Sequence, residues 1–190
     1  MRTSLFVFTL LVFPFMAHAQ SGQMSKKQKD SLDRAYEKKL EMLTHGQDSL
    51  KNSKIPAITF TTTDGKHFPE DFKGKILVLN FYATWCGPCR KEMPELNELK
   101  SEFANDSVEF VSFCSDCDSI SIKNFLAHVP FNYRSVVNPD AKKMLDIFYI
   151  TSYPTNIITG KNGEFILFES GYSNLIVKQM RKELKKQLHK

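Results

Sequence analysis

Four cysteines stand in two pairs of the same spacing, Cys86 with Cys89 and Cys114 with Cys117. Two cysteines separated by two residues can cycle between a dithiol and a disulfide, form a static disulfide or supply half of a zinc site. A pair that exchanges with other disulfides needs one sulfur that ionises near neutral pH and a second sulfur close to it. The strands and helices predicted around each pair therefore indicate its chemistry.

The first pair follows a predicted buried strand and opens a predicted helix. Residues 76–83 form an almost unbroken apolar run, which is typical of a strand covered on both faces in a parallel sheet. Pro88 suits the first turn of a helix, because its missing N–H would have no intrahelical partner there. The positive end of that helix favours a thiolate at Cys86, so we expect Cys86 to be the nucleophile. Cys89 is then the shielded thiol that resolves a mixed disulfide.

The residues around the first pair favour exchange over a zinc site or a static disulfide, because Trp85 precedes the pair and Gly87 and Pro88 separate it. Residues 79–94 resemble, almost residue for residue, the core motif of the thioredoxin superfamily and in particular of its TlpA/ResA-like extracytoplasmic branch. The resemblance runs from about residue 55 to the C-terminus. It implies a thioredoxin-like three-layer α/β/α sandwich with a mixed central sheet and a TlpA/ResA-like insertion. The residues that it implies as support for the dithiol are Trp85, Gly87, Pro88, Glu92, Tyr153, Pro154 and Thr155.

Three positions carry particular expectations from this resemblance. Asn80 stands where thioredoxins proper have a buried aspartate, so that acid is absent. Glu92 matches a glutamate that lies near the dithiol in ResA-like proteins, and it follows Cys89 by three residues, on the same helix face. Glu92 is therefore either a proton carrier for Cys89 or an ordinary glutamate that the helix dipole favours. Pro154 is implied to be the cis-proline that faces the dithiol and leaves the preceding backbone free to pair with an incoming peptide.

The second pair is not part of the family pattern. Cys114 ends a predicted strand, residues 108–114, and parallel neighbouring strands end on the same edge of a sheet, so both pairs are expected on one side. We favour an isolated structural or reversible disulfide. Two alternatives stay open: an auxiliary pair that relays electrons, and a four-cysteine metal site. Asp116 and Asp118 predict that the second pair is less nucleophilic than Cys86, because nearby carboxylates disfavour a thiolate.

The rest of the domain, residues 55–190, alternates predicted strands and helices, which indicates an α/β fold. The pattern ends in a hairpin and a helix, the latter with Ile176, Met180, Leu184 and Leu188 on one face. The predicted strands are residues 58–61, 76–83, 108–114, 133–137, 156–158 and 164–168, and the predicted helices start at 87, cover 119–128 and 140–148, and run from 174 to the end.

The amino-terminal part divides into a predicted signal peptide and a charged helical extension. Residues 1–19 combine Arg2, an apolar stretch and an Ala-His-Ala cleavage site, and the stretch is short for a bilayer span. We expect cleavage rather than retention as an anchor, and a periplasmic or other extracytoplasmic location. The extension covers residues 20–54, with a helix over 24–45 and Gly46 as its stop signal. We expect it to pack on the domain or to be marginally ordered rather than to be a tether or partner-binding arm.

Composition and charge limit the number of domains and the kinds of partner and cofactor to expect. The 190 residues suffice for one domain, and the net charge of +5 falls to +4 without Arg2. The basic residues are dispersed without a reading motif, so no nucleic acid partner is expected. We expect no cofactor, because no Gly-rich phosphate-binding motif appears, and no resident metal, because no histidine lies at ligand spacing from a cysteine.

Sequence and resemblance together predict a thiol:disulfide oxidoreductase that reduces disulfides in exported proteins, cytochrome c apoproteins among them. An exported dithiol must be kept oxidised or re-reduced, which implies protein substrates and an upstream electron donor, expected to be membrane-associated. Two alternatives stay open: a disulfide oxidant or isomerase, and a metal- or haem-handling binding module that uses all four cysteines.

Overall fold

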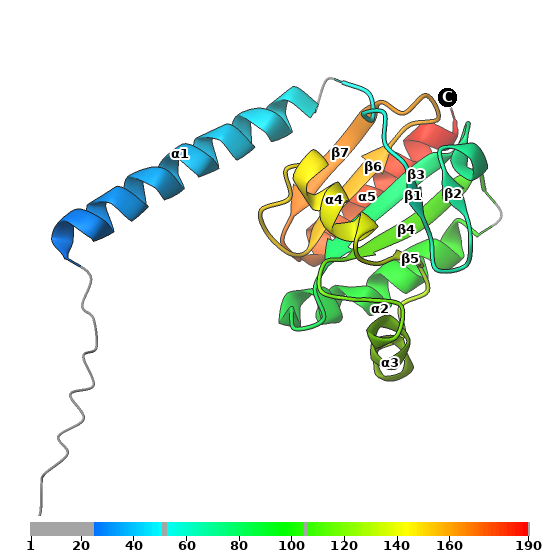
Figure 1. Ribbon diagram of the computed structural model, residues 1–190. Helices are drawn as coiled ribbons and strands as arrows, with labels where there is room; N and C mark the ends of the chain where they lie inside the picture. The colour runs from blue at the N-terminus through cyan, green and yellow to red at the C-terminus, as the bar shows by residue number, and fades with distance from the viewer. Residues whose placement is uncertain (1–24, 51–52, 105, 190) are drawn as a thin grey trace, which may run out of the picture. The chain divides into compact units, whose positions relative to one another are not determined.

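The computed structural model describes residues 25–50, 53–104 and 106–189 (Figure 1). The described residues before Lys38 belong to one compact unit, and the chain from Lys38 onward forms another. The predicted signal peptide, residues 1–19, lies outside the described residues and stays a prediction. Among the described residues, no helix is both long enough and apolar enough to cross a membrane.

Seven strands, five α-helices and a short 3-10 helix follow one another along the described chain. They are α1 (Lys26–Leu50), β1 (Phe60–Thr61), β2 (His67–Phe68), η1 (Glu70–Phe72), β3 (Ile76–Tyr82), α2 (Gly87–Glu102), β4 (Val108–Cys114), α3 (Ser121–His128), β5 (Arg134–Val136), α4 (Asp140–Ile147), β6 (Thr155–Thr159), β7 (Phe165–Ser170) and α5 (Asn174–Leu188).

The main sheet has five strands in the order β5-β4-β3-β6-β7. The strands β3, β4 and β5 run parallel, and β6 is antiparallel to both β3 and β7. A separate antiparallel ladder joins β1 to β2. The mixed sheet confirms the fold class that the resemblance implied, and β5 and α4 are the strand and helix that it assigns to an insertion.

The central strand β3 is buried over all seven of its residues, as its apolar run predicted. Because side chains alternate along a strand, Ile76 and Val78 join a core with α2, α3 and α5, whereas Leu77 and Leu79 join a second core with α4 and the β1–β2 segment. In Figure 1 the helices α4 (yellow) and α5 (red) lie on opposite sides of the sheet. The sheet is therefore the middle of three layers.

Gly46 does not end the first helix, which corrects the expectation from the sequence: α1 continues to Leu50. A Cβ at Gly46 would lie 2.6 Å from the ring of Tyr149, and the side chain of Gln47 donates a hydrogen bond to the Tyr149 carbonyl at 2.6 Å. Glycine is thus required for the close approach of a ring rather than for a helix end. Leu50 is buried in the core, whereas Tyr36, in the first unit, is exposed.

The buried face of α5 is rotated from the predicted one. The fully covered side chains are Val177, Met180, Leu184 and Gln187, and Ile176 and Leu188 lie at the edge of the face. Other boundaries moved by up to two residues. The strand expected at 58–61 is only Phe60–Thr61, and the helix expected from residue 119 starts at Ser121.

We expect the substitution Phe113→Ala to lower the free energy of unfolding by about 3–5 kcal/mol, because it removes a fully buried ring. The ring of Phe113 stacks on Phe81 at a centroid distance of 4.7 Å and meets the ring of Phe60 edge-on at 5.2 Å. Urea unfolding followed by circular dichroism measures the change. Leu175→Ala, on the exposed surface of α5, is the control and should stay within about 0.5 kcal/mol. A loss below about 1 kcal/mol for Phe113→Ala would contradict the expectation.

Candidate active site

The first cysteine pair lies where β3 turns into α2. Cys86 is the N-cap of α2, with the extended backbone angles usual for that position, and Pro88 lies in the first turn, as predicted. A disulfide joins Cys86 to Cys89. Cys89 is fully buried and Cys86 retains 5% exposure, so Cys86 is the more accessible of the two sulfurs.

The start of α2 favours negative charge on the Cys86 sulfur. The backbone N–H of Cys89 points at Sγ of Cys86 with an N···S distance of 3.2 Å. The first turn of α2 contains no acidic residue, and unpaired N–H groups give a helix start a partial positive charge. In the reduced pair these groups stabilise a Cys86 thiolate, which is the form that attacks disulfides.

Glu92 is buried on α2 together with two asparagines from neighbouring strands. Asn80 on β3 and Asn156 on β6 are direct partners in the antiparallel register. The side-chain amide of Asn80 donates to Oε1 of Glu92 at 2.7 Å and to Oδ1 of Asn156 at 2.9 Å, and the amide of Asn156 donates to Oε2 of Glu92 at 3.2 Å. All three side chains are at most 1% exposed. Glu92 is therefore not the ordinary solvated glutamate of a first helical turn.

Burial raises the pKa of Glu92 from its ordinary value of 4.5 to about 7. The two asparagine amides act in the opposite direction, and the charge of Glu95 raises the pKa slightly further. Burial also raises the pKa of Tyr133 well above its usual range, and the negative charge of Glu92 adds to that effect. A carboxyl group with a pKa near 7 can give or take a proton at neutral pH.

The loop before β6 lies at the same edge of the sheet as the first cysteine pair. Thr155 is paired with Phe81 in the register of β6 with β3, so Pro154 adjoins the end of β3 from which Cys86 follows. The Tyr153–Pro154 bond is cis, as the resemblance implied. The ring of Tyr153 contacts the exposed indole of Trp85 edge-on, at a centroid distance of 6.0 Å.

Only some of the backbone hydrogen-bonding groups around Pro154 have a partner within the described chain. The carbonyl of Pro154 accepts a hydrogen bond from Gly171 N, and the hydroxyl of Thr155 donates to the carbonyl of Ser152. Within the described part of the chain, no hydrogen bond engages the backbone N–H or C=O of Tyr153. Tyr153 therefore offers the backbone groups with which an extended peptide can pair.

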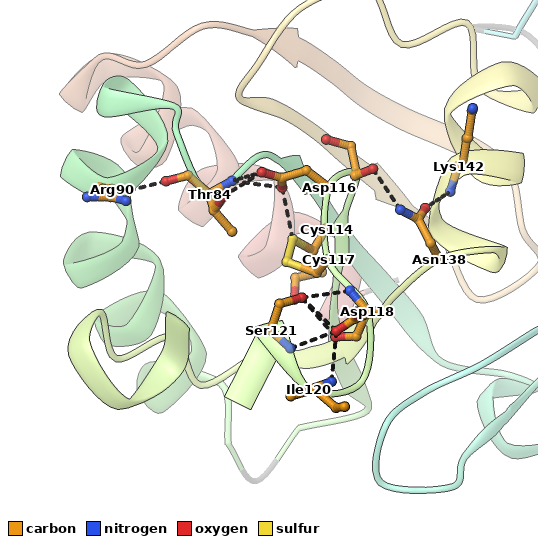
Figure 2. Close-up of a disulfide and its surroundings, with 12 residues drawn as sticks. Thr84, Arg90, Cys114, Asp116, Cys117, Asp118, Ile120, Ser121, Asn138 and Lys142 are labelled. Atoms are coloured by element: carbon orange, nitrogen blue, oxygen red, sulfur yellow. Dashed lines mark hydrogen bonds between the residues drawn. A yellow bond between two sulfur atoms is a disulfide. The ribbon is translucent and has the colours of Figure 1, made fainter. Parts of the chain in front are cut away.

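The second cysteine pair is brought to the same edge of the sheet. Cys114 is paired with Tyr82 in the parallel register of β4 with β3, and a disulfide joins Cys114 to Cys117. Both sulfur-bearing residues are at most 1% exposed. Figure 2 shows Asp116, between them, pointing at Thr84 in the turn before Cys86.

The four cysteines do not gather into one ligand set, which is a finding against a four-cysteine metal site. Among the described residues, the only group of three or more side chains with ligand atoms close enough for a metal ion consists of Cys114, Asp116 and Cys117. That group omits Cys86 and Cys89, and a disulfide joins its two sulfurs.

Two side chains at the site make contacts that the sequence does not predict. Asn156 donates a hydrogen bond to Glu92, and Asp116 contacts the turn before the first pair. The available signal for Asn156 was a polar residue inside an apolar strand. The same signal is visible at Asn80, and two such positions on paired strands indicate a buried polar cluster.

Comparison with known proteins assigns the fold and the motif to a family. A model described as Redoxin matches residues 50–165, more than half of the chain. The chain belongs to the Redoxin family. Its relatives include the thiol-disulfide oxidoreductase ResA of Bacillus thuringiensis subsp. konkukian, 32% identical over 114 residues, which are 60% of this chain and 65% of that protein. ResA of Bacillus subtilis is 30% identical over 128 residues, 66% of this chain and 71% of the relative.

A solved structure supports this Redoxin assignment. The thiol:disulfide interchange protein of the thioredoxin family from Chlorobium tepidum superposes with a TM-score of 0.61 and 25% identity, over 72% of this chain and 97% of that one. Relatives and structure together place the chain among TlpA/ResA-like members of the thioredoxin superfamily, as the residues around Cys86 and Cys89 indicated.

The raised pKa of Glu92 predicts that this residue makes the protein less stable as the pH rises. Between about pH 4.5 and pH 7 the folded chain holds a proton on Glu92 that the unfolded chain has lost, so the free energy of unfolding falls over this window. Relative to Glu92→Gln, wild type should lose on the order of 3 kcal/mol from below to above the window. Chemical denaturation at a series of pH values measures the difference.

Glu98→Gln, on the exposed face of the same helix, is the matched control and should leave the pH profile of wild type unchanged. If the free energy of unfolding had the same pH dependence in wild type and in Glu92→Gln, that result would contradict a protonated Glu92 in the folded chain.

Proposed function

We propose that this protein is an exported thiol:disulfide oxidoreductase that reduces disulfides in other exported proteins. The observation that carries the proposal is the placement of Cys86 at the start of α2, with the N–H of Cys89 directed at its sulfur and the free backbone of Tyr153 at the same sheet edge. The names of the ResA relatives support the same chemistry.

The proposed reaction is a two-step exchange. The Cys86 thiolate attacks one sulfur of the partner's disulfide; a bond forms between Cys86 and that sulfur, and the partner's other sulfur leaves as a thiolate. Cys89 then attacks the Cys86 sulfur and releases the partner's second thiolate. The partner gains two electrons and two protons, and Cys86 and Cys89 become a disulfide. A cis Pro154 with its neighbour Tyr153 holds the partner's backbone in this scheme, and Trp85 covers the site beside it.

Glu92 is the proposed proton acceptor for Cys89. The resolving thiol must lose its proton before it attacks, and Glu92 follows Cys89 by three residues on the same helix face, a spacing that supports this role. The pKa of about 7 suits this task, because Glu92 is then partly ionised at neutral pH. Replacement by glutamine should slow resolution rather than the first attack.

We infer the direction of transfer from the motif and the location from the predicted signal peptide. The Gly87-Pro88 dipeptide and the TlpA/ResA-like residues favour reduction, and cytochrome c apoproteins are one class of substrate with paired cysteines. A signal peptide at residues 1–19 would deliver the chain to an extracytoplasmic compartment. There the disulfide that each turnover leaves must be reduced again by an upstream dithiol donor, proposed to be membrane-associated.

Two cysteine variants test the order of the steps. Cys86→Ser should reduce insulin disulfides no faster than the uncatalysed dithiothreitol reaction, because the accessible thiolate is lost and the three remaining cysteines are at most 1% exposed. Cys89→Ser should also lose turnover but accumulate a mixed disulfide with the substrate, visible on a non-reducing gel. Insulin reduction by Cys86→Ser at the wild-type rate would contradict the mechanism.

The reduction potential of the first pair tests the direction. Equilibration with glutathione or dithiothreitol, followed by alkylation and peptide mass spectrometry, should place the Cys86/Cys89 couple near the thioredoxin value of roughly -270 mV. A value near roughly -120 mV would make the protein a disulfide donor instead.

A further inference from the structure

The loop between the two cysteines of the second pair carries an exposed carboxylate, Asp116, that also holds the turn before the nucleophile. One oxygen of Asp116, Oδ1, accepts a hydrogen bond from Thr84 N at 2.9 Å and lies 3.3 Å from Sγ of Cys114. The hydroxyl of Thr84 donates to the other oxygen, Oδ2. Figure 2 shows Asp116 between Thr84 and the disulfide. A single carboxylate oxygen thus touches both the active-site turn and the second pair.

Thr84 is held from both sides, and Cys86 follows it by two residues. Its N–H donates to Asp116, and its carbonyl accepts a hydrogen bond from Nε of Arg90 on α2 at 2.8 Å. The N–H of Cys86 closes the turn on the carbonyl of Ala83 at 3.1 Å. The position of the Cys86 sulfur at the start of α2 therefore depends on where Thr84 is held.

The loop that carries Asp116 is short and anchored. Ser115 N donates to the carbonyl of Tyr82, which extends the β3–β4 ladder, and Asn138 N donates to the carbonyl of Cys117. Between these anchors the disulfide closes a four-residue loop around Asp116. Asp118 faces the other way, because its Oδ1 accepts from Ile120 N and Ser121 N at the start of α3.

We propose that Cys114 and Cys117 form a second, regulatory redox site, and that Asp116 couples its state to the Cys86/Cys89 pair. This inference rests on the proposed function of the first pair. With the disulfide closed, Asp116 is held on Thr84. With the disulfide reduced, the Cys114 thiol competes for the oxygen that holds Thr84 N–H, or as a thiolate repels it, and the loop loses its crosslink.

The chemistry of the switch is one dithiol–disulfide exchange. An external dithiol, either a small molecule or a protein, gives two electrons and two protons; the Cys114–Cys117 bond breaks, two thiols form, and the donor becomes a disulfide. Because both residues are at most 1% exposed, the loop must open before a thiolate reaches either sulfur. The second pair therefore exchanges more slowly than the first.

The test is the glutathione equilibrium of the Cys86/Cys89 pair in matched variants. In the double variant Cys114→Ser/Cys117→Ser, Thr84 is held less firmly and the Cys86 thiolate loses stabilisation. The equilibrium should shift about fivefold toward the Cys86–Cys89 disulfide, with a rise in the Cys86 pKa measured from the pH dependence of alkylation. In an Asp116→Ala background, the same pair of serines should change the equilibrium by less than about twofold. Asp118→Asn is the control and should match wild type.

Wild type provides the same test without a variant. Fragmentation of the intact alkylated chain reports both pairs in one molecule, and the first pair's equilibrium should differ about fivefold between molecules with the second pair closed and open. An unchanged equilibrium, or an equal shift with and without Asp116, would overturn the coupling. A Cys86/Cys89 pair that does not exchange with glutathione at all would instead overturn the proposed function.

Discussion

The pairing of β3 with a neighbour on each side is the constraint on which the site depends. Hydrogen bonds to β4 and β6 fix the carboxyl end of a strand whose side chains are all buried. The register then sets three placements at once: Thr155 beside Phe81, Asn156 beside Asn80 and Cys114 beside Tyr82. The cysteine motif continues from the end of β3, the proline loop leads into its partner β6, and the second pair begins at the end of its partner β4, so all three lie at one edge of the sheet.

Burial that stabilises this strand also creates the chemistry of Glu92. A carboxyl group inside an apolar core costs stability when it is charged, and two asparagine amides offset only part of that cost. The resulting pKa of about 7 leaves the group partly ionised at neutral pH. A leucine at this position would pack better and would carry no proton. The core therefore loses stability at Glu92, on the helix that carries the resolving cysteine, a conflict between packing and polarity that is typical of functional sites.

Local patterns in the sequence were sufficient for β3, β4 and the start of α2, because an apolar run, a proline and a capping position lie within a few residues of one another. Contacts between distant residues were not predictable in this way. Asp116 meets Thr84 across 32 positions and Asn156 meets Glu92 across 64. The sequence alone gives Asp116 a charge near the second pair and places Asn156 in a strand, without a partner for either. The prediction that Gly46 ends the first helix was wrong for the same reason. A glycine in a helical pattern usually indicates a helix end, but here it allows the distant ring of Tyr149 to approach the helix.

The turn at Thr84 makes side-chain hydrogen bonds to two elements, the helix α2 and the loop after β4. Arg90 holds its carbonyl and moves with α2, whereas Asp116 holds its N–H and moves with the end of β4. The positive charge of Arg90 lies at the carbonyl of Thr84, and the negative charge of Asp116 lies at its N–H. Each charge therefore faces the end of a peptide dipole that it attracts. In the proposed coupling, a displacement of either element tilts Thr84, and the turn that Cys86 N closes on Ala83 carries the displacement to Cys86. A disulfide beside Asp116 is thus placed where a change in one loop can act on the turn before the nucleophile through Asp116 and Thr84.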